Sequence, residues 1–176
     1  MKKTFIMAAL VAVAAMFASC EKSEPTALTV EDLGGKVIVK GYAELLALEK
    51  DGTTIKQAQL KAVENTEIVV LCGIDNTGDA VVDEWTQYKT TTNGNGFYEI
   101  TIPCEKGKGF DELKAQCTTV GTTACLDADN EVVSGVTADF FGEAKLAGAA
   151  AEGNLYSLDI QVAPKVLHGN LEYNIP

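Results

Sequence analysis

The sequence contains no arginine, and this absence narrows the partners that the protein can recognise. Its basic residues are 14 lysines against 25 aspartates and glutamates, so the formal net charge is −11. Arginine supplies the planar fork that grips phosphate and carboxylate groups at two points, and without it an anion site has only lysine and backbone amides. An acidic surface also repels nucleic acid. We therefore expect neither a nucleic-acid partner nor a phosphate-handling enzyme.

Histidine is almost absent as well, and the common catalytic motifs are missing. The only histidine is His168, between Leu167 and Gly169. There is no Gly-x-Ser-x-Gly elbow, no phosphate-binding glycine loop and no His-Glu-x-x-His pair. General bases need a positioned cleft, so we expect His168 to be an ordinary surface residue. The sequence predicts a protein that is not an enzyme, with no catalytic residues and no cofactor.

Long hydrophobic runs are confined to the N-terminus. Lys2 and Lys3 precede an apolar stretch at residues 5–17, which is too short for a permanent membrane span. The stretch ends in Phe17-Ala18-Ser19-Cys20, which resembles a bacterial lipobox. The resemblance implies that residues 1–19 are a removed signal peptide and that Cys20 carries lipid. The alternative is an ordinary secretory signal cut at a small residue.

A polar segment follows the cysteine. Residues 20–32 read as a lipidated terminus and flexible tether, and residues 33–176 have a suitable length for one domain. The tether is similar to the acidic, serine-containing stretch of surface-exported lipoproteins of the Bacteroidota type, although Lys22 interrupts it. The expected location is the outer membrane, with lipid on Cys20 in the membrane and the domain facing the periplasm or the cell surface.

The remaining cysteines form an even set. In an oxidising compartment four cysteines predict two disulfides, while the absence of Cys-x-x-Cys argues against zinc and leaves no predicted metal site. Sequence permits three pairings. A hairpin turning at Gly121 would place two of the cysteines opposite each other. We favour pairing 117 with 125 and 72 with 104, among the candidates Cys72, Cys104, Cys117 and Cys125.

Short runs of β-branched and aromatic residues separated by Gly, Asn and Asp predict an all-β protein. Residues 36–42 alternate apolar and polar positions, and residues 67–72 are continuously apolar like a buried central strand. The clearest unit is a predicted β-hairpin over residues 85–103, turning at Asn93-Gly94-Asn95-Gly96.

The hairpin region resembles the pattern of carboxypeptidase regulatory-like, prealbumin-type domains. The resemblance rests on the segment Thr-Thr-Thr-Asn-Gly-Asn-Gly-Phe-Tyr-Glu-Ile-Thr-Ile-Pro at residues 90–103. With the lipobox, it makes the chain similar to small lipoproteins of the Bacteroidota type. It implies an antiparallel β-sandwich of about seven strands, prealbumin/Ig-like.

Two regions are candidates for contacts. Aromatic residues around the predicted hairpin can stack on a sugar or anchor a protein, and the candidates are Trp85, Tyr88 and Phe97. Alternation places Phe97 on the side of Glu99, away from the core. Residues 75–84 are acidic and invite Ca²⁺, but their spacing does not fit an EF-hand, and a solvated loop is the favoured interpretation.

These features predict a non-catalytic binding or structural module at the cell envelope. The partner is the membrane through Cys20, together with a protein or a glycan. Two alternatives remain open at this point: an accessory or pilin-like subunit of a surface assembly, and a dedicated glycan-binding module.

Overall fold

A computed structural model describes residues 28–169 and residue 175. The predicted signal peptide and Cys20 lie outside the described residues. The described chain is all-β apart from one capped helical turn at its start. Its elements are α1 (Val30–Leu33), β1 (Gly34–Leu45), β2 (Leu48–Asp51), β3 (Thr54–Gln57), β4 (Lys61–Ala62), β5 (Glu67–Ile74), β6 (Glu84–Thr91), β7 (Phe97–Glu105), β8 (Glu112–Leu126), β9 (Val132–Lys145), β10 (Leu155–Ser157) and β11 (Ile160–Leu167).

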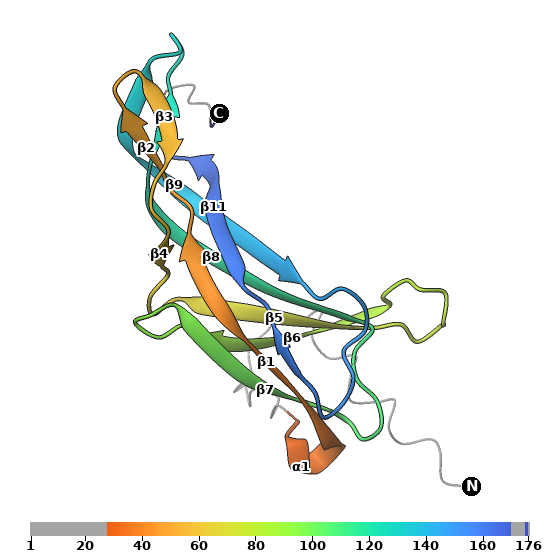
Figure 1. Cartoon of the computed structure of the whole chain (residues 1–176). Helices are drawn as coiled ribbons and strands as arrows, with labels where there is room; N and C mark the ends of the chain where they lie inside the picture. Colours follow the sequence, from red (N-terminus) through yellow and green to blue (C-terminus); the bar gives the residue numbers. More distant parts are fainter. Residues whose placement is uncertain (1–27, 170–174, 176) are drawn as a thin grey trace, which may run out of the picture.

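Strand β1 connects two groups of strands into one curled sheet (Figure 1). Its first part pairs with β7 and β10, whereas its last residues pair with β11 and β4. From β11 the sheet continues through β9, β8 and β5 to β6, and β2 with β3 forms a separate ribbon. The ribbon and α1 lie at opposite ends of the molecule (Figure 1).

The all-β prediction is confirmed, but two details of the predicted sandwich are wrong. The described chain has eleven strands, not about seven, because several short strands, β2, β3, β4 and β10, accompany the long ones. The sheet is also mixed, since β1 runs parallel to both β10 and β11. The chain leaves β9 by a long connection before β10 begins. Strands β10 and β11 then run beside β1 in the same direction as β1, which makes both pairings parallel.

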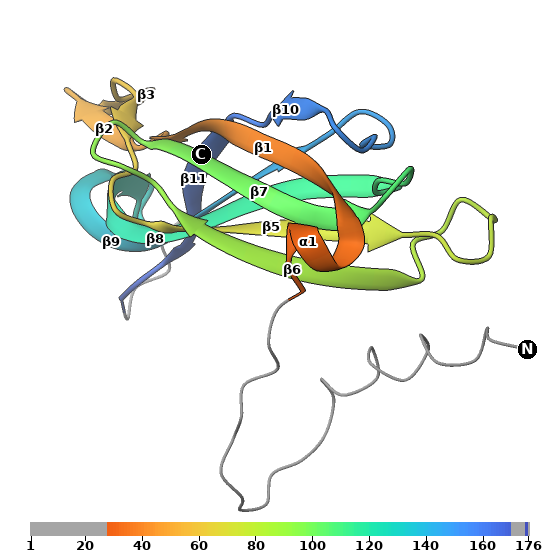
Figure 2. The same ribbon diagram turned by 90° about the horizontal axis from the view of Figure 1, so that it is seen from below.

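The predicted hairpin over residues 85–103 is wrong as a pairing, although both strands and the turn exist. Strand β6 pairs with β5 along its whole length, and β7 pairs with β1. Figure 2 shows β7 beside β1 and β6 beside β5, so the turn carries the chain from one group of strands to the other. Strands β6 and β7 thereby join larger groups of strands with a buried face. An isolated two-stranded hairpin would have no such face and would be only marginally stable.

The predicted turn at Gly121 is also wrong. Gly121 lies inside β8, opposite Ala138 of β9, and the two strands form a long antiparallel ribbon. A Cβ at Gly121 would lie 3.1 Å from Cε2 of Phe140, which is fully buried. This glycine therefore makes room for an aromatic ring rather than reversing the chain.

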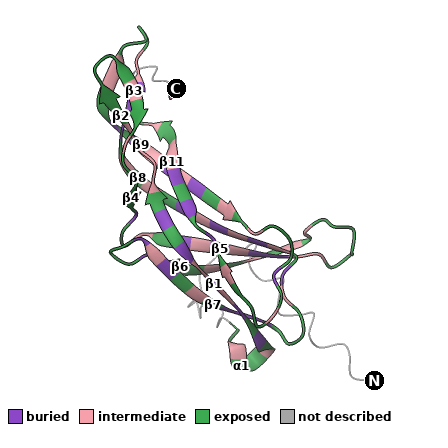
Figure 3. Ribbon diagram, viewed as in Figure 1, coloured by how far each residue is buried: buried purple, intermediate pink, exposed green. Residues whose placement is uncertain are grey.

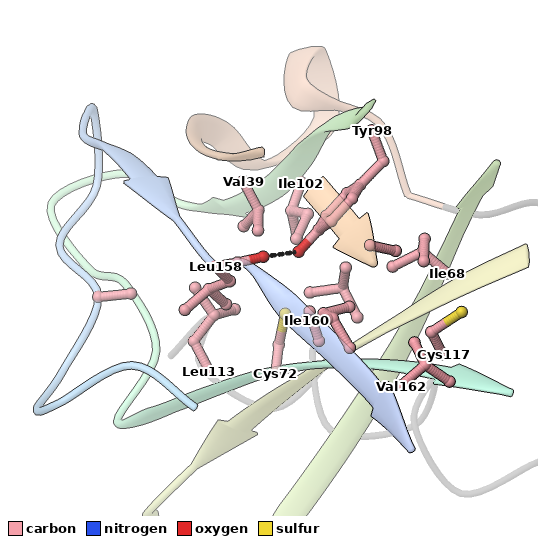
Figure 4. Close-up of a cluster of buried hydrophobic side chains, with 14 of the residues drawn as sticks. Val39, Ile68, Cys72, Tyr98, Ile102, Leu113, Cys117, Leu158, Ile160 and Val162 are labelled. Carbon is pink, nitrogen blue, oxygen red and sulfur yellow. Dashed lines mark hydrogen bonds between the residues drawn. The ribbon is translucent and has the colours of Figure 1, made fainter. Parts of the chain in front are cut away.

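Buried residues from most of the strands form one hydrophobic core, and Figure 3 shows their positions along the ribbon in purple. Alternate residues of β1 and β7 are buried there, as their sequence alternation predicts. In β5 the continuously apolar run also buries mainly alternate residues, so its second face is only half-buried. Tyr98 is the largest fully buried side chain, and its hydroxyl donates a hydrogen bond to the carbonyl oxygen of Leu158 (Figure 4). Gly41 lies against the same carbonyl and leaves space for this bond. Tyr98 thus connects β7 to the segment between β10 and β11.

Candidate functional site

The structure separates the three predicted contact aromatics. Trp85 lies on the outer face of β6 and is 43% exposed. It stands opposite Gly73 of β5, where a Cβ would lie 3.1 Å from its Cζ3 atom, so the indole covers the gap that the glycine leaves. The ammonium of Lys114 lies 4.7 Å from the ring centroid, within the range of a cation–π contact. These contacts give Trp85 a structural role.

Charged side chains hold this arrangement in place. Glu112 binds Lys114 at 2.6 Å and Lys145 at 2.8 Å. Hydrogen bonds from Lys114 and then Lys145 keep the pKa of Glu112 below its ordinary value. One carboxylate therefore neutralises much of the local positive charge, which leaves little attraction for an anion beside Trp85.

Tyr88 lies on the opposite face of β6 and packs against the core. Burial raises the pKa of its phenol, and the nearby Cys72 and Cys104 add to this effect. Tyr88 and Trp85 therefore cannot contact one ligand together.

Phe97 lies on the outer face of β7, as the alternation predicts, and it has a partner that the sequence did not reveal. Tyr42 of β1 stands directly opposite it in the ladder. The ring centroids are 5.4 Å apart with planes tilted by 59°, a favourable geometry for an aromatic pair. Tyr42 is 50% exposed. Its backbone N–H donates to Asp159 Oδ1 at 2.9 Å, which fixes β1 at this point.

Further apolar side chains extend this surface. Leu155 of β10 is 49% exposed and stands opposite the half-buried Ile38 of β1. Between them and the aromatic pair, Lys40 stands opposite Glu99. We call the surface formed by Tyr42, Phe97, Ile38 and Leu155 the aromatic face. It combines rings, aliphatic groups and one pair of opposite charges on a strand-built surface.

A separate groove of about 660 Å³ lies where three segments meet, at residues 74–76, 105 with 107–111, and 149–152. Its rim carries Asp75, Glu105, Asp111 and Glu152. These carboxylates are engaged: Glu105 binds Lys108 at 2.7 Å, Glu152 accepts from the Gly107 amide at 3.2 Å, and Asp111 accepts from the Asp75 amide at 2.8 Å. The carboxylates that line the groove therefore stabilise the loops that form it.

The acidic loop over residues 75–84 is organised by its own carboxylates. Asp75 accepts hydrogen bonds from the backbone amides of Gly78 at 2.6 Å, Ala80 at 2.7 Å and Thr77 at 3.0 Å. Asp83 accepts from the amides of Asn76 and Thr77. The bond from Gly78 is the largest cause that lowers the pKa of Asp75. The carboxylates of Asp75 and Asp83 therefore organise the backbone of this loop.

The four core cysteines are thiols in the structure, and one predicted pairing is excluded by geometry. Cys117 and Cys125 lie on the same extended strand, β8, so their Cα atoms are about 26 Å apart at roughly 3.3 Å per residue, far beyond disulfide reach. Cys72 and Cys104 lie on β5 and β7, and both belong to the same buried core. Burial, followed by the neighbouring Cys104, raises the pKa of Cys72 to about 12. Pairing of 72 with 104 stays a prediction.

His168 is a surface residue. Its Nε2 lies 2.9 Å from Oδ1 of Asp139, and both side chains are nearly half exposed. Among residues 28–169 there is no cluster of three or more His, Cys, Asp or Glu side chains arranged to hold a metal ion. Within the same range no helix has the length and apolar character needed to cross a membrane.

Comparison with known proteins does not assign this chain to a family. Neither any family model nor any curated protein matches the chain. Among solved structures, a 9R-lipoxygenase from Cyanothece PCC8801 aligns with a TM-score of 0.37 and 18% identity over 84% of this chain. The alignment spans 19% of the lipoxygenase, and a similarity this low carries no inference about activity.

Proposed function

We propose that this protein is an exported, lipid-anchored module that binds a partner through the aromatic face and performs no catalysis. The observation that carries the proposal is the Tyr42–Phe97 pair, whose rings lie 5.4 Å apart on the outer side of the β1–β7 ladder. The core does not require these rings, because Tyr98 and its neighbours already form it. Exposed aromatic pairs are effective anchors for sugars and protein surfaces.

The position of the aromatic face suits display from a membrane. The described chain begins just before α1 at one end of the molecule, and the proposed anchor at Cys20 precedes this element in the sequence (Figure 1). Tyr42 follows Gly34, the first residue of β1, by eight residues, so it lies about 26 Å further along the strand at roughly 3.3 Å per residue. The net charge of −11 repels anionic lipid and anionic polymers. A neutral glycan or a protein is therefore the ligand class that we favour.

We also propose that the curled sheet is a variant of the prealbumin/Ig-like sandwich. Two groups of strands, one around β1 and β7 and one around β5 and β8, turn their buried faces to a common core, which is the basis of a sandwich. In this interpretation β1 and β11 bridge the two layers.

Binding by the aromatic face is tested with single substitutions. We expect at least one neutral polysaccharide in a broad panel to retard the full chain in affinity electrophoresis. Tyr42→Ser should weaken this binding by up to about tenfold, since an aromatic contact contributes about 0.5–1.5 kcal/mol. Val120→Ser is the matched control, because Val120 is 64% exposed on a different strand. Equal weakening by both substitutions would refute the role of this face, and flat results across the panel would refute a neutral glycan as ligand.

A structural role in a surface assembly is the second candidate. It is supported by β6 and β7, each of which pairs with a partner strand on one side only among the described residues. Such edges can accept a strand from another chain. Light scattering at high concentration tests this candidate: a species larger than the monomer is expected, and a monomer throughout the concentration range would contradict it.

A further inference from the structure

The turn between β6 and β7 contains two Asn-Gly pairs, Asn93-Gly94 and Asn95-Gly96. At such a pair the backbone nitrogen of the glycine can attack the side-chain carbonyl carbon of the asparagine, because glycine has no side chain to obstruct the approach. In an unfolded chain the two pairs are chemically similar. The folded structure makes them different.

The side-chain oxygen of Asn93 is held by two backbone donors. Its Oδ1 accepts hydrogen bonds from the backbone amides of Asn95 at 2.9 Å and Phe97 at 3.1 Å. Two amide donors on one carbonyl oxygen stabilise the negative charge that develops there when a nucleophile adds to the carbon, as in an oxyanion hole. No hydrogen bond from Nδ2 of the exposed Asn93 is formed within residues 28–169, so the leaving amine faces solvent.

The two glycine nitrogens also differ. Gly94 is exposed, and its amide makes no hydrogen bond within the described part of the chain. Gly96 is buried, its amide donates to the carbonyl oxygen of Asn93 at 3.0 Å, and its own carbonyl accepts from Ala43 at 2.9 Å. The nucleophile beside Asn93 is therefore free, whereas the one beside Asn95 is occupied and fixed.

We propose that Asn93 is a self-modification site at which the folded turn promotes loss of the side-chain amide. The Gly94 nitrogen loses its proton to solvent and bonds to Cγ of Asn93, and the Cγ–Nδ2 bond breaks. Nδ2 takes up a proton and leaves as ammonia, which produces a cyclic imide. Water then opens the imide at either carbonyl and leaves an aspartyl or isoaspartyl residue at position 93. The balance is one water consumed and one ammonia released, with no oxidation or reduction.

The product would change the junction between the two groups of strands. A carboxylate appears four residues before Phe97 of the aromatic face, on an already acidic chain. The isoaspartyl form also inserts an extra backbone atom into a turn whose Asn93 amide donates to Phe97 O at 2.8 Å. Modification at Asn93 therefore alters the setting of Phe97, whether or not that face binds the proposed partner.

The test compares the two asparagines within one molecule. The purified full chain is incubated in mildly alkaline buffer containing water enriched in heavy oxygen, either folded or in concentrated urea, and positions 93 and 95 are mapped by peptide mass spectrometry. We expect similar labelling of both positions in urea and strong preference for position 93 in the folded chain. A ratio that is unchanged by folding, or that shifts toward position 95, would overturn the proposal.

Gly94→Ala is the companion variant. A Cβ at Gly94 meets nothing within 4 Å, so the variant should keep the fold, which the unfolding midpoint verifies. The added methyl group obstructs the attacking nitrogen and should slow modification at position 93 by roughly tenfold or more. An unchanged rate in a folded Gly94→Ala chain would show that the Gly94 nitrogen is not the nucleophile.

Discussion

The contact between Gly41 and Leu158 gives a quantitative test of the fold, through the substitution Gly41→Ala. A Cβ at position 41 would lie 2.7 Å from the carbonyl carbon of Leu158, closer still to its oxygen, and 3.1 Å from the hydroxyl of Tyr98. Two of these neighbours are backbone atoms, so relief requires movement of the chain between β10 and β11. The same movement disturbs the buried hydrogen bond from Tyr98 to Leu158.

The expected magnitude combines three effects. Displacing packed backbone costs about 1–3 kcal/mol, and weakening a buried hydrogen bond costs about 1 kcal/mol. Alanine restricts the unfolded chain and returns about 0.4–1 kcal/mol. Gly41→Ala should therefore lower the free energy of unfolding by about 1–3.5 kcal/mol.

Gly94→Ala is the matched control, since its Cβ would enter open space. It should leave stability unchanged or raise it by up to about 1 kcal/mol. The assay is equilibrium urea unfolding followed by the fluorescence of Trp85, the only tryptophan. If Gly41→Ala unfolds within about 0.5 kcal/mol of Gly94→Ala, the close packing of β1 against Leu158 is refuted.

Three further predictions concern the anchor, the thiols and the acidic loop. Labelled palmitate should enter the chain in a bacterial host and be lost in Cys20→Ser, and label that persists in the variant would contradict lipidation at this residue. Peptide mapping without reductant, after oxidation, should find Cys72 joined to Cys104, and other pairings would refute this prediction. Asp75→Ala removes the acceptor of three loop amides, so hydrogen exchange over residues 77–80 should accelerate while the core stays protected. Folding lowers the pKa of Asp75 below its ordinary value of 3.8, so its contribution to loop stability is present above that pH and is lost as the pH falls through the lower folded value. Protection factors, corrected for the intrinsic exchange rate at each pH, that are equal across this range would refute the link.

The strands were predictable from sequence because their signals are local. Alternation along residues 36–42 and the apolar run at residues 67–72 identify strands β1 and β5, since side chains on successive positions face opposite sides. The same signals do not specify partners. The turn at Asn93 exists as predicted, yet β6 and β7 separate after it, because β6 pairs with β5 and β7 pairs with β1.

The predictions for Gly121 and for the cysteines also depended on strand pairing, which local sequence does not specify. Gly121 is a residue type that is common in turns, but here it accommodates the ring of Phe140 from the neighbouring strand β9. The pairing of Cys117 with Cys125 depended on that turn and failed with it. Pairing of Cys72 with Cys104 needed no local turn, and the structure places both thiols in one core.

The candidate binding surface was likewise only partly predictable from the sequence. Phe97 was predicted to face outward from alternation within its own strand, and it does so. Tyr42 could not be identified, because its contact with Phe97 depends on the register between β1 and β7. Trp85, the most conspicuous residue in the sequence, is accounted for by Gly73 and Lys114 without any ligand. A residue that fills a gap in its own sheet is weak evidence for binding, whereas Tyr42 and Phe97 fill no such gap. This difference is the reason to assign the partner to their face and not to Trp85.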